Sequence, residues 1–292
     1  IRLAIPSLMS SSIVQVNVVI SSSFASLFGP GSVAALNIAD RVWQLPYGIF
    51  AQGMGIAMLP TISGRYAVGD LDEYRSILKK SLKTVLFFAI PSAFGFVVLR
   101  YPLIKTIIKF TNLVNEDGIE NTARILMFFT IALITHSIVA IVNRGFYAIN
   151  DTKTPLFTGM GAIAVNFLCS FIFYTFFRES LAAGGMALAY SIASLMNAVV
   201  LLALLNKKVG RLGLTEIVVF MAKTMLASLV MALILAVLGS LMGNIPENKI
   251  YQILILCFEI GIGVIVYFVM VMILKVKEAK AMFRQLLSRV GF

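Results

Sequence analysis

Two opposite charges stand side by side in an otherwise apolar stretch, at Asp40 and Arg41, and Gln44 follows one helical turn later. A charge at the middle of a bilayer costs roughly 2.5–3.5 kcal/mol, so such a residue needs a partner, an anion or water. The planar guanidinium of arginine donates paired hydrogen bonds that match phosphate. One interpretation is that Arg41 binds an anionic substrate in a wet cavity, with Asp40 holding or tuning it. The alternative is an interface pair in which Arg41 extends to lipid headgroups.

Polar side chains also recur along the first apolar segment, and Gln15 and Asn17 are among them. So many hydroxyl and amide groups indicate either close helix packing or a helix that lines a hydrated cavity. Asn166 and Ser170 are four residues apart and share a helix face. With Asn17 they offer neutral oxygens to a cation, but a hard cation usually takes at least one carboxylate as well. Hydrogen bonding between helices is the interpretation we favour for these three residues.

The composition excludes several classes of protein. Of 292 residues, 60% are hydrophobic and 13% are charged, and the net charge is +11. A water-soluble fold could not bury so much apolar surface, so a soluble enzyme or a nucleic-acid binder is excluded. The single histidine, His136, and two widely spaced cysteines offer neither a metal cluster nor a catalytic triad. We expect an all-α polytopic membrane protein that is not an enzyme and needs no cofactor.

The apolar stretches predict about eight transmembrane helices, because a crossing takes about 20 apolar residues. The segment 70–80 is predicted as a separate amphipathic helix on the membrane surface, and the basic tail 275–292 in the same way. Lys and Arg gather in one set of alternate connections, which predicts that both ends of this chain are cytoplasmic. The predicted spans are 3–28, 33–67, 82–104, 122–149, 155–177, 183–205, 215–242 and 250–274.

Several ordered motifs resemble those of one family. They are the run Ala39-Asp40-Arg41-Val42-Trp43-Gln44-Leu45-Pro46-Tyr47-Gly48-Ile49, the run Leu59-Pro60-Thr61-Ile62-Ser63, the run from Arg144 to Pro155 that contains Phe146-Tyr147-Ala148 and Asp151-Thr152-Lys153-Thr154-Pro155, and the run Gly185-Met186-Ala187-Leu188-Ala189-Tyr190-Ser191-Ile192-Ala193 with Asn197. Together these motifs are similar to those of the lipid II flippase family, within the multidrug/oligosaccharidyl-lipid/polysaccharide exporter superfamily.

The resemblance implies a fourteen-helix transporter with two six-helix lobes and two additional helices. This chain would hold the second lobe (1–206), the two additional helices with a groove for a lipid tail (207–274) and a cytoplasmic tail (275–292). The N-terminal six-helix lobe would be a partner outside this chain. Alternating access would move lipid II, an undecaprenyl-diphosphate-linked precursor, across the bacterial inner membrane for cell-wall synthesis.

Carried over to single residues, Arg41 matches the family arginine that contacts the diphosphate, while Gln44 stands where the family often has an acid. The candidate substrate-binding residues are Arg41, Asp40, Gln44, Gln15 and Arg2. Sodium at Asn17, Asn166 and Ser170, or the membrane potential, would drive transport. The alternatives are another exporter of the superfamily, for polysaccharide units or drugs, and a membrane scaffold that does not transport.

Overall fold

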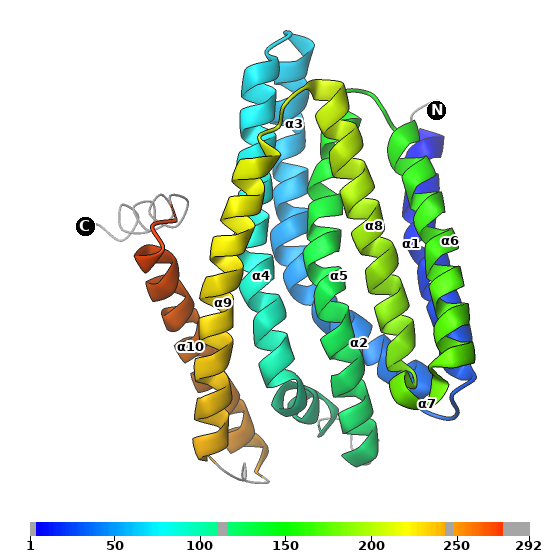
Figure 1. The fold of residues 1–292 in the computed structure, drawn as a ribbon, viewed down its shortest axis with the longest axis vertical. Coiled ribbons are helices and arrows are strands. Elements are labelled where there is room, and N and C mark those ends of the chain that lie inside the picture. Colours follow the sequence, from blue (N-terminus) through cyan, green and yellow to red (C-terminus); the bar gives the residue numbers. More distant parts are fainter. Residues whose placement is uncertain (1–3, 110–115, 243–247, 277–292) are drawn as a thin grey trace.

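The computed structural model describes residues 4–109, 116–242 and 248–276, and within these ranges every long element is a helix. The helices run roughly side by side along the long axis of the molecule (Figure 1). The elements are α1 (Ala4–Ser26), α2 (Ser32–Pro46), the π-helix η1 (Tyr47–Gln52), α3 (Gly53–Ala67), α4 (Leu71–Lys109), α5 (Glu116–Ala148), α6 (Lys153–Phe176), α7 (Arg178–Leu181), α8 (Gly184–Val209), α9 (Leu214–Met242) and α10 (Lys249–Ile273).

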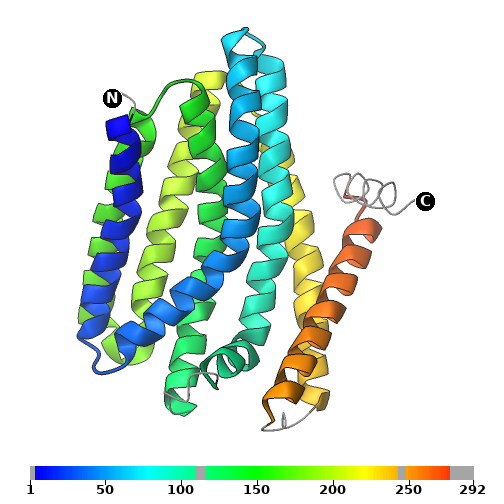
Figure 2. The same cartoon turned by 180° about the vertical axis from the view of Figure 1, so that it is seen from behind.

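Six of these helices are long and apolar enough to cross a membrane, namely α4, α5, α6, α8, α9 and α10. The other two predicted spans correspond to α1, whose side chains are described from Gln15 onward, and to α2, η1 and α3. The last three follow one another without a break, but α2 is inclined to α3 (Figures 1 and 2), and each piece alone is shorter than a crossing requires. The chain is therefore an all-α membrane protein. Six helices meet these criteria within the described residues, and the count of eight transmembrane helices stays a prediction.

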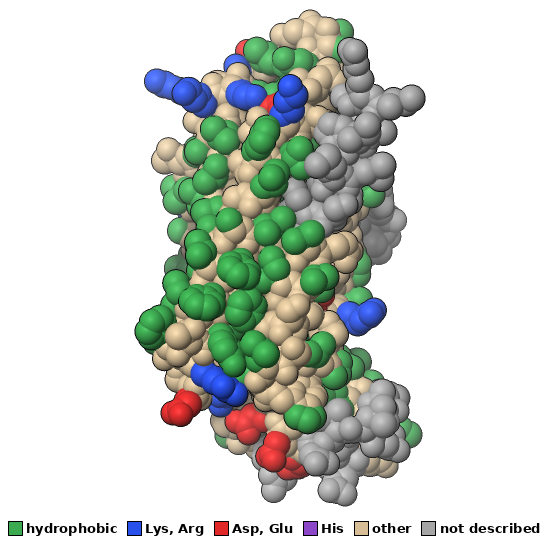
Figure 3. All heavy atoms as spheres, turned by 90° about the vertical axis from the view of Figure 1, so that its right-hand side faces the viewer, with side chains coloured by type: hydrophobic (Ala, Val, Ile, Leu, Met, Phe, Trp, Pro, Cys, Tyr) green, Lys and Arg blue, Asp and Glu red, His purple; other side chains and the backbone are tan. Residues whose placement is uncertain are grey.

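The helix α5 is the centre of the bundle, because α2, α3, α4 and α8 all pack on it. Its Leu126, Leu133 and Ile141 are completely buried. At one edge α1 packs on α6, and at the other edge α9 and α10 pack on α4 and on each other (Figures 1 and 2). Seen from the α6 side, hydrophobic side chains cover the middle of the molecule and charged side chains gather at its ends (Figure 3). This distribution fits a bundle that is surrounded by lipid along its length.

The prediction of a surface helix at 70–80 is wrong. These residues, from Leu71 on, form the first turns of the long helix α4. Tyr74 and Leu78 have no exposed surface, and the Tyr74 hydroxyl donates a 2.8 Å hydrogen bond to the Gly145 carbonyl on α5. Their apolar face therefore packs against protein rather than against the membrane surface.

Hydrogen bonds and an ion pair join α4 to the end of α8 and to the last two helices. Arg75 Nε donates to the Val209 carbonyl at 2.6 Å, and Lys79 Nζ lies 3.0 Å from Glu216 Oε2 at the start of α9. On α10, the Tyr267 hydroxyl donates to the Phe87 carbonyl of α4 at 2.8 Å. The helix α4 thus joins the α9–α10 pair to the rest of the bundle. These contacts do not test the domain boundary predicted near residue 206, which stays a prediction.

The turn between α5 and α6 is held by Asp151. Its Oδ1 accepts from the Thr154 amide at 3.0 Å, its Oδ2 accepts from the Thr154 hydroxyl at 2.6 Å, and Lys208 on α8 pairs with the same carboxylate. Burial alone would raise the pKa of Asp151, but the hydrogen bonds from Lys208 and Thr154 outweigh it and lower that pKa. The ionised carboxylate therefore stabilises the fold above the ordinary pKa of an aspartate, and this contribution is lost as the pH falls through the lowered pKa.

We expect Asp151→Asn to reduce the free energy of unfolding by about 1 kcal/mol at pH 7, since Lys208 is partly screened by solvent. Towards pH 3 the variant and the parent protein should converge. Thermal unfolding in detergent at both pH values measures this difference. The matched control is Asp72→Asn, because the Asp72 side chain is 96% exposed and its pairing contributes little. A difference that stays constant with pH would contradict the role of the ionised carboxylate.

Candidate functional site

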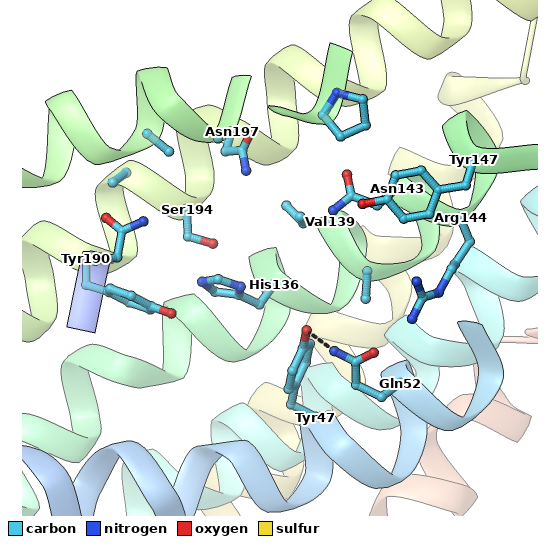
Figure 4. Close-up of a pocket in the computed structure, with 16 residues that line it drawn as sticks. Tyr47, Gln52, His136, Val139, Asn143, Arg144, Tyr147, Tyr190, Ser194 and Asn197 are labelled. Atoms are coloured by element: carbon cyan, nitrogen blue, oxygen red, sulfur yellow. Dashed lines mark hydrogen bonds between the residues drawn. The ribbon is translucent and has the colours of Figure 1, made fainter. Parts of the chain in front are cut away.

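A polar pocket lies inside the bundle, between α1, η1, α5, α6 and α8 (Figure 4). Its volume is about 200 Å³. In Figure 4, Arg144, Asn143 and Tyr147 lie toward one end of the pocket and Tyr190 and His136 toward the other. The lining side chains are Asn17, Tyr47, Gln52, His136, Val139, Ala140, Asn143, Arg144, Tyr147, Pro155, Gly159, Ala162, Tyr190, Ala193, Ser194 and Asn197.

The largest polar wall of the pocket comes from a single stripe along α5. His136, Asn143, Arg144 and Tyr147 line it together with Val139 and Ala140. Successive members are one or three residues apart, so they recur on one face of the helix. On α8, the residues that line the pocket also recur on one face of the helix, namely Tyr190, Ala193, Ser194 and Asn197. The lining residues of α6 are small and leave the space open.

The π-helix η1 connects α2 to α3 and forms one wall of the pocket. A π-helix places residues i and i+5 on the same side, and such segments occur frequently at functional sites. Tyr47 and Gln52 are five apart, and Gln52 Nε2 donates a 2.6 Å hydrogen bond to the Tyr47 hydroxyl (Figure 4). The irregular segment therefore presents two linked polar groups to the pocket.

Arg144 is the cation of the pocket. Its guanidinium lies 5.9 Å from the centre of the Tyr147 ring, and no carboxylate pairs with it in the described part of the chain. Gly55 on α3 leaves room for it, since a Cβ there would lie 3.3 Å from Arg144 Cγ.

Two buried amide oxygens, Asn143 Oδ1 and Asn197 Oδ1, have no hydrogen-bond partner among the described groups. Unpaired buried acceptors are costly. Together with the guanidinium, they suit a polar ligand that offers hydroxyl or amide donors beside an acceptor or a negative charge.

An aromatic cluster closes one end of the pocket. His136 stacks on Tyr190 with ring centres 5.1 Å apart, and the buried Trp43 lies 5.4 Å from His136. Trp43 Nε1 donates to Asp40 Oδ1 at 2.9 Å, and Gln44 Nε2 donates to Asp40 Oδ2 at 2.6 Å. Asp40 therefore fixes Trp43 and Gln44, because a side chain three or four residues on is nearer than the adjacent one on a helix.

The structure separates the predicted substrate residues from this pocket. Arg41, Gln44 and Gln15 are exposed and do not line it, and Asp40 lines a smaller neighbouring cavity. Arg2 lies outside the described residues. Of the predicted set, the structure brings together Asp40 and Gln44 on one helix.

The three residues considered for sodium do meet. Asn166 Nδ2 on α6 donates to Asn17 Oδ1 on α1 at 3.0 Å, and Ser170 Oγ lies 3.5 Å from Asn166 Oδ1. All three are buried. The expected hydrogen bonding between helices is present for Asn17 and Asn166, whereas Ser170 bonds within α6, and the sodium role stays a prediction. No group of three or more His, Cys, Asp or Glu side chains that could hold a metal is found within the described residues.

Sequence reasoning missed the main cation of the pocket. In the sequence, Arg144 stands out only as the first residue of a family motif, and His136 only as the single histidine. The available signal was the spacing of His136, Asn143, Arg144 and Tyr147, which places four polar residues on one face of an apolar helix. Gln52 had no such signal, because its position depends on the π-helix.

This helical bundle is one of the architectures of polytopic membrane transporters. The chain shares its fold with an outward-facing multidrug resistance MATE family transporter of the MOP superfamily, with a TM-score of 0.58 and 15% identity over 92% of this chain and 62% of that chain.

The chain belongs to the lipid II flippase MurJ family, whose model matches residues 1–254. It is 32% identical over 206 residues to the probable lipid II flippase MurJ of Rhizobium tropici. This match covers 70% of this chain and 38% of that relative. It also resembles a solved lipid II flippase MurJ in an inward closed conformation, with a TM-score of 0.72 and 27% identity over 92% of this chain and 53% of that chain. The chain thus spans about half the length, or less, of these proteins.

We expect Asp40→Ala to destabilise the bundle by about 1.5–3 kcal/mol, because it removes a charged acceptor from the buried indole of Trp43. Trp43 is the single tryptophan of the sequence, so its fluorescence reports this site during thermal unfolding of the purified chain. Asp40→Asn keeps one acceptor oxygen and should have a smaller effect. The control is Arg41→Ala on the exposed face of α2; equal effects of Asp40→Ala and Arg41→Ala would contradict this assignment.

Proposed function

We propose that this chain forms the second half of a transporter that flips lipid II across the bacterial cytoplasmic membrane. The observation that carries the proposal is the match of residues 1–254 to the lipid II flippase MurJ family, supported by the likeness to the solved flippase. The diphosphate and sugars of lipid II are too polar to cross hydrocarbon unaided, whereas its prenyl tail can stay in lipid. Transport would proceed by alternating access and without covalent chemistry.

In this proposal Arg41 contacts the diphosphate. Arg41 is exposed on α2, and no ion pair of Arg41 occurs within the described residues. Both carboxylate oxygens of Asp40 accept hydrogen bonds from Trp43 and Gln44, and no ion pair between Asp40 and Arg41 occurs within the described residues. An arginine with free N–H donors suits a diphosphate, and the exposed surface of α2 would face the N-terminal six-helix lobe outside this chain. Gln44, Gln15 and Arg2 would be neighbouring contacts.

The pocket around Arg144 would serve the same transport cycle from within the lobe. Its unpaired amide oxygens and guanidinium suit the hydroxyl, amide and anionic groups of a glycopeptide precursor. Coupling to sodium at Asn17, Asn166 and Ser170, coupling to the membrane potential, a lipid-tail groove on α9 and α10, and cytoplasmic placement of both chain ends are further parts of the proposal. The family match favours lipid II over a polysaccharide unit or a drug, and over a scaffold role.

The first test of the proposal replaces Arg41 in the full-length protein. We expect Arg41→Ala to abolish rescue of cells depleted of their own lipid II flippase, since a hydrogen bond to a charged group contributes about 1.5–3 kcal/mol. Arg41→Lys keeps the charge without the planar fork and should rescue in part. Lys153→Ala, at another exposed cation, is the control at matched membrane levels. Full rescue by both Arg41 variants would remove Arg41 from the substrate site.

A second test addresses the pocket. Arg144→Met retains most of the side-chain volume and removes the guanidinium, so we expect the protein to reach the membrane and to lose most of its flipping activity. Lipid II accessibility at the outer face of the membrane measures this loss. Lys80→Met is the matched control, because Lys80 is an exposed cation outside the pocket. Normal activity of Arg144→Met would show that the pocket is only structural.

A further inference from the structure

The guanidinium of Arg144 has no acidic partner for its positive charge. The side chain is half-buried in the pocket, and neither a hydrogen bond nor an ion pair of Arg144 occurs within the described residues. None of the described residues that line the pocket is Asp or Glu. A guanidinium donates five N–H groups in a planar fork, and a carboxylate accepts two of them in parallel. The pocket therefore offers an open position for a negatively charged acceptor.

Two acceptor groups face the same space. Asn143 on α5 and Asn197 on α8 extend into the pocket (Figure 4), and the Oδ1 atom of each is buried without a hydrogen-bond partner among the described groups. A carbonyl oxygen only accepts hydrogen bonds, so these atoms need N–H or O–H groups from a ligand or from water. Asn143 directly precedes Arg144 on α5. A ligand that satisfies both residues therefore carries a donor close to its negative charge.

The pocket admits a small group. Its volume is about 200 Å³, whereas clefts that bury a drug-sized ligand span roughly 300–1,000 Å³. A disaccharide is a ligand of that larger size, so it exceeds the pocket. Between the polar groups the walls consist of short apolar side chains such as Ala162, Ala193 and Pro155, which leave room for a methyl group.

Charge separates the remaining parts of a lipid-linked glycopeptide. A diphosphate carries at least two negative charges, and Arg144 is the one Lys or Arg among the described residues that line the pocket. Sugar hydroxyls are uncharged and would leave the guanidinium without a counter-charge. The end of a peptide chain offers one carboxylate with an amide N–H on the same residue. If the side chain of that residue is a methyl group, it matches the cation, the acceptors and the small apolar walls together.

We propose that this pocket binds the carboxylate end of the peptide that lipid II carries, and that it thereby selects substrates by their peptide. Arg144 pairs with the carboxylate, while Asn143 and Asn197 accept hydrogen bonds from peptide N–H groups. This inference rests on the proposed function. It divides the substrate between two arginines, because the exposed Arg41 would contact the diphosphate and Arg144 the peptide.

The test compares two lipid-linked probes that differ in one group. Both carry the diphosphate, the disaccharide and the peptide L-Ala–D-isoglutamine–L-Lys–D-Ala–D-Ala. One probe ends in a free carboxylate, which is the single carboxylate of its peptide, and the other ends in a carboxamide. We expect the purified full-length protein to bind the carboxylate probe about tenfold to hundredfold more tightly, as a hydrogen-bonded pair of charges predicts. Arg144→Met should remove this preference and change the affinity for the carboxamide probe much less.

Matched variants separate this inference from the proposed function. Arg41→Met should weaken the binding of both probes by the same factor and keep the preference. Asn197→Leu should also weaken both, because both probes keep their peptide N–H groups. Arg144→Gln is a second neutral variant, in case Arg144→Met does not fold.

Three results would count against the inference. Equal affinities of the parent protein for the two probes would overturn it and leave the proposed function standing. A parent protein that binds neither probe would contradict both. A preference that persists in Arg144→Met or Arg144→Gln would place the carboxylate elsewhere and overturn the inference.

Discussion

Polar groups inside a bilayer must find their partners within the protein, and this constraint shapes the whole bundle. The helix pairs are joined by such bonds: Asn166 on α6 bonds to Asn17 on α1, and the Thr135 hydroxyl on α5 lies 2.7 Å from the Ser194 hydroxyl on α8. The Ser191 hydroxyl also donates to the Phe128 carbonyl at 2.8 Å. Apolar packing alone does not distinguish one helix face from another in lipid, so these bonds set which faces meet.

The exceptions to this constraint mark the places where the molecule can act. Arg144 has no carboxylate partner, Asn143 and Asn197 keep unpaired acceptor oxygens, and Glu259 has one unpaired oxygen, all within the described residues. The first three gather in one pocket and the last lies at a separate interface. Buried polar groups in proteins are normally paired. The few unpaired ones therefore mark two cavities where a polar ligand or water would gain hydrogen bonds.

Much of the fold was predictable because the apolar segments are long and their boundaries carry clear signals, such as Gly29-Pro30-Gly31 after the first helix. The misplaced segment 70–80 shows the limit: its apolar face fits a membrane surface and a protein core equally well, and only the contact of Tyr74 with α5 decides. The site was harder to predict from the sequence than the fold. The hydrogen bonds of Asp40 depend on which rotamer the neighbours permit, and the pairing of Tyr47 with Gln52 depends on a π-helix that no residue pattern indicates.

The two arginines that the sequence places in apolar segments occupy different environments, yet a chain of contacts connects them. Arg41 is exposed on α2, and the adjacent Asp40 holds Trp43, which packs against His136 in the pocket that Arg144 also lines. Directly after α2 comes η1, whose Tyr47 lies 5.5 Å from Trp43 between ring centres. Side chains in contact thus connect the pocket with the exposed surface of α2, and sharp changes in the direction of a helix occur at π-helical segments such as η1.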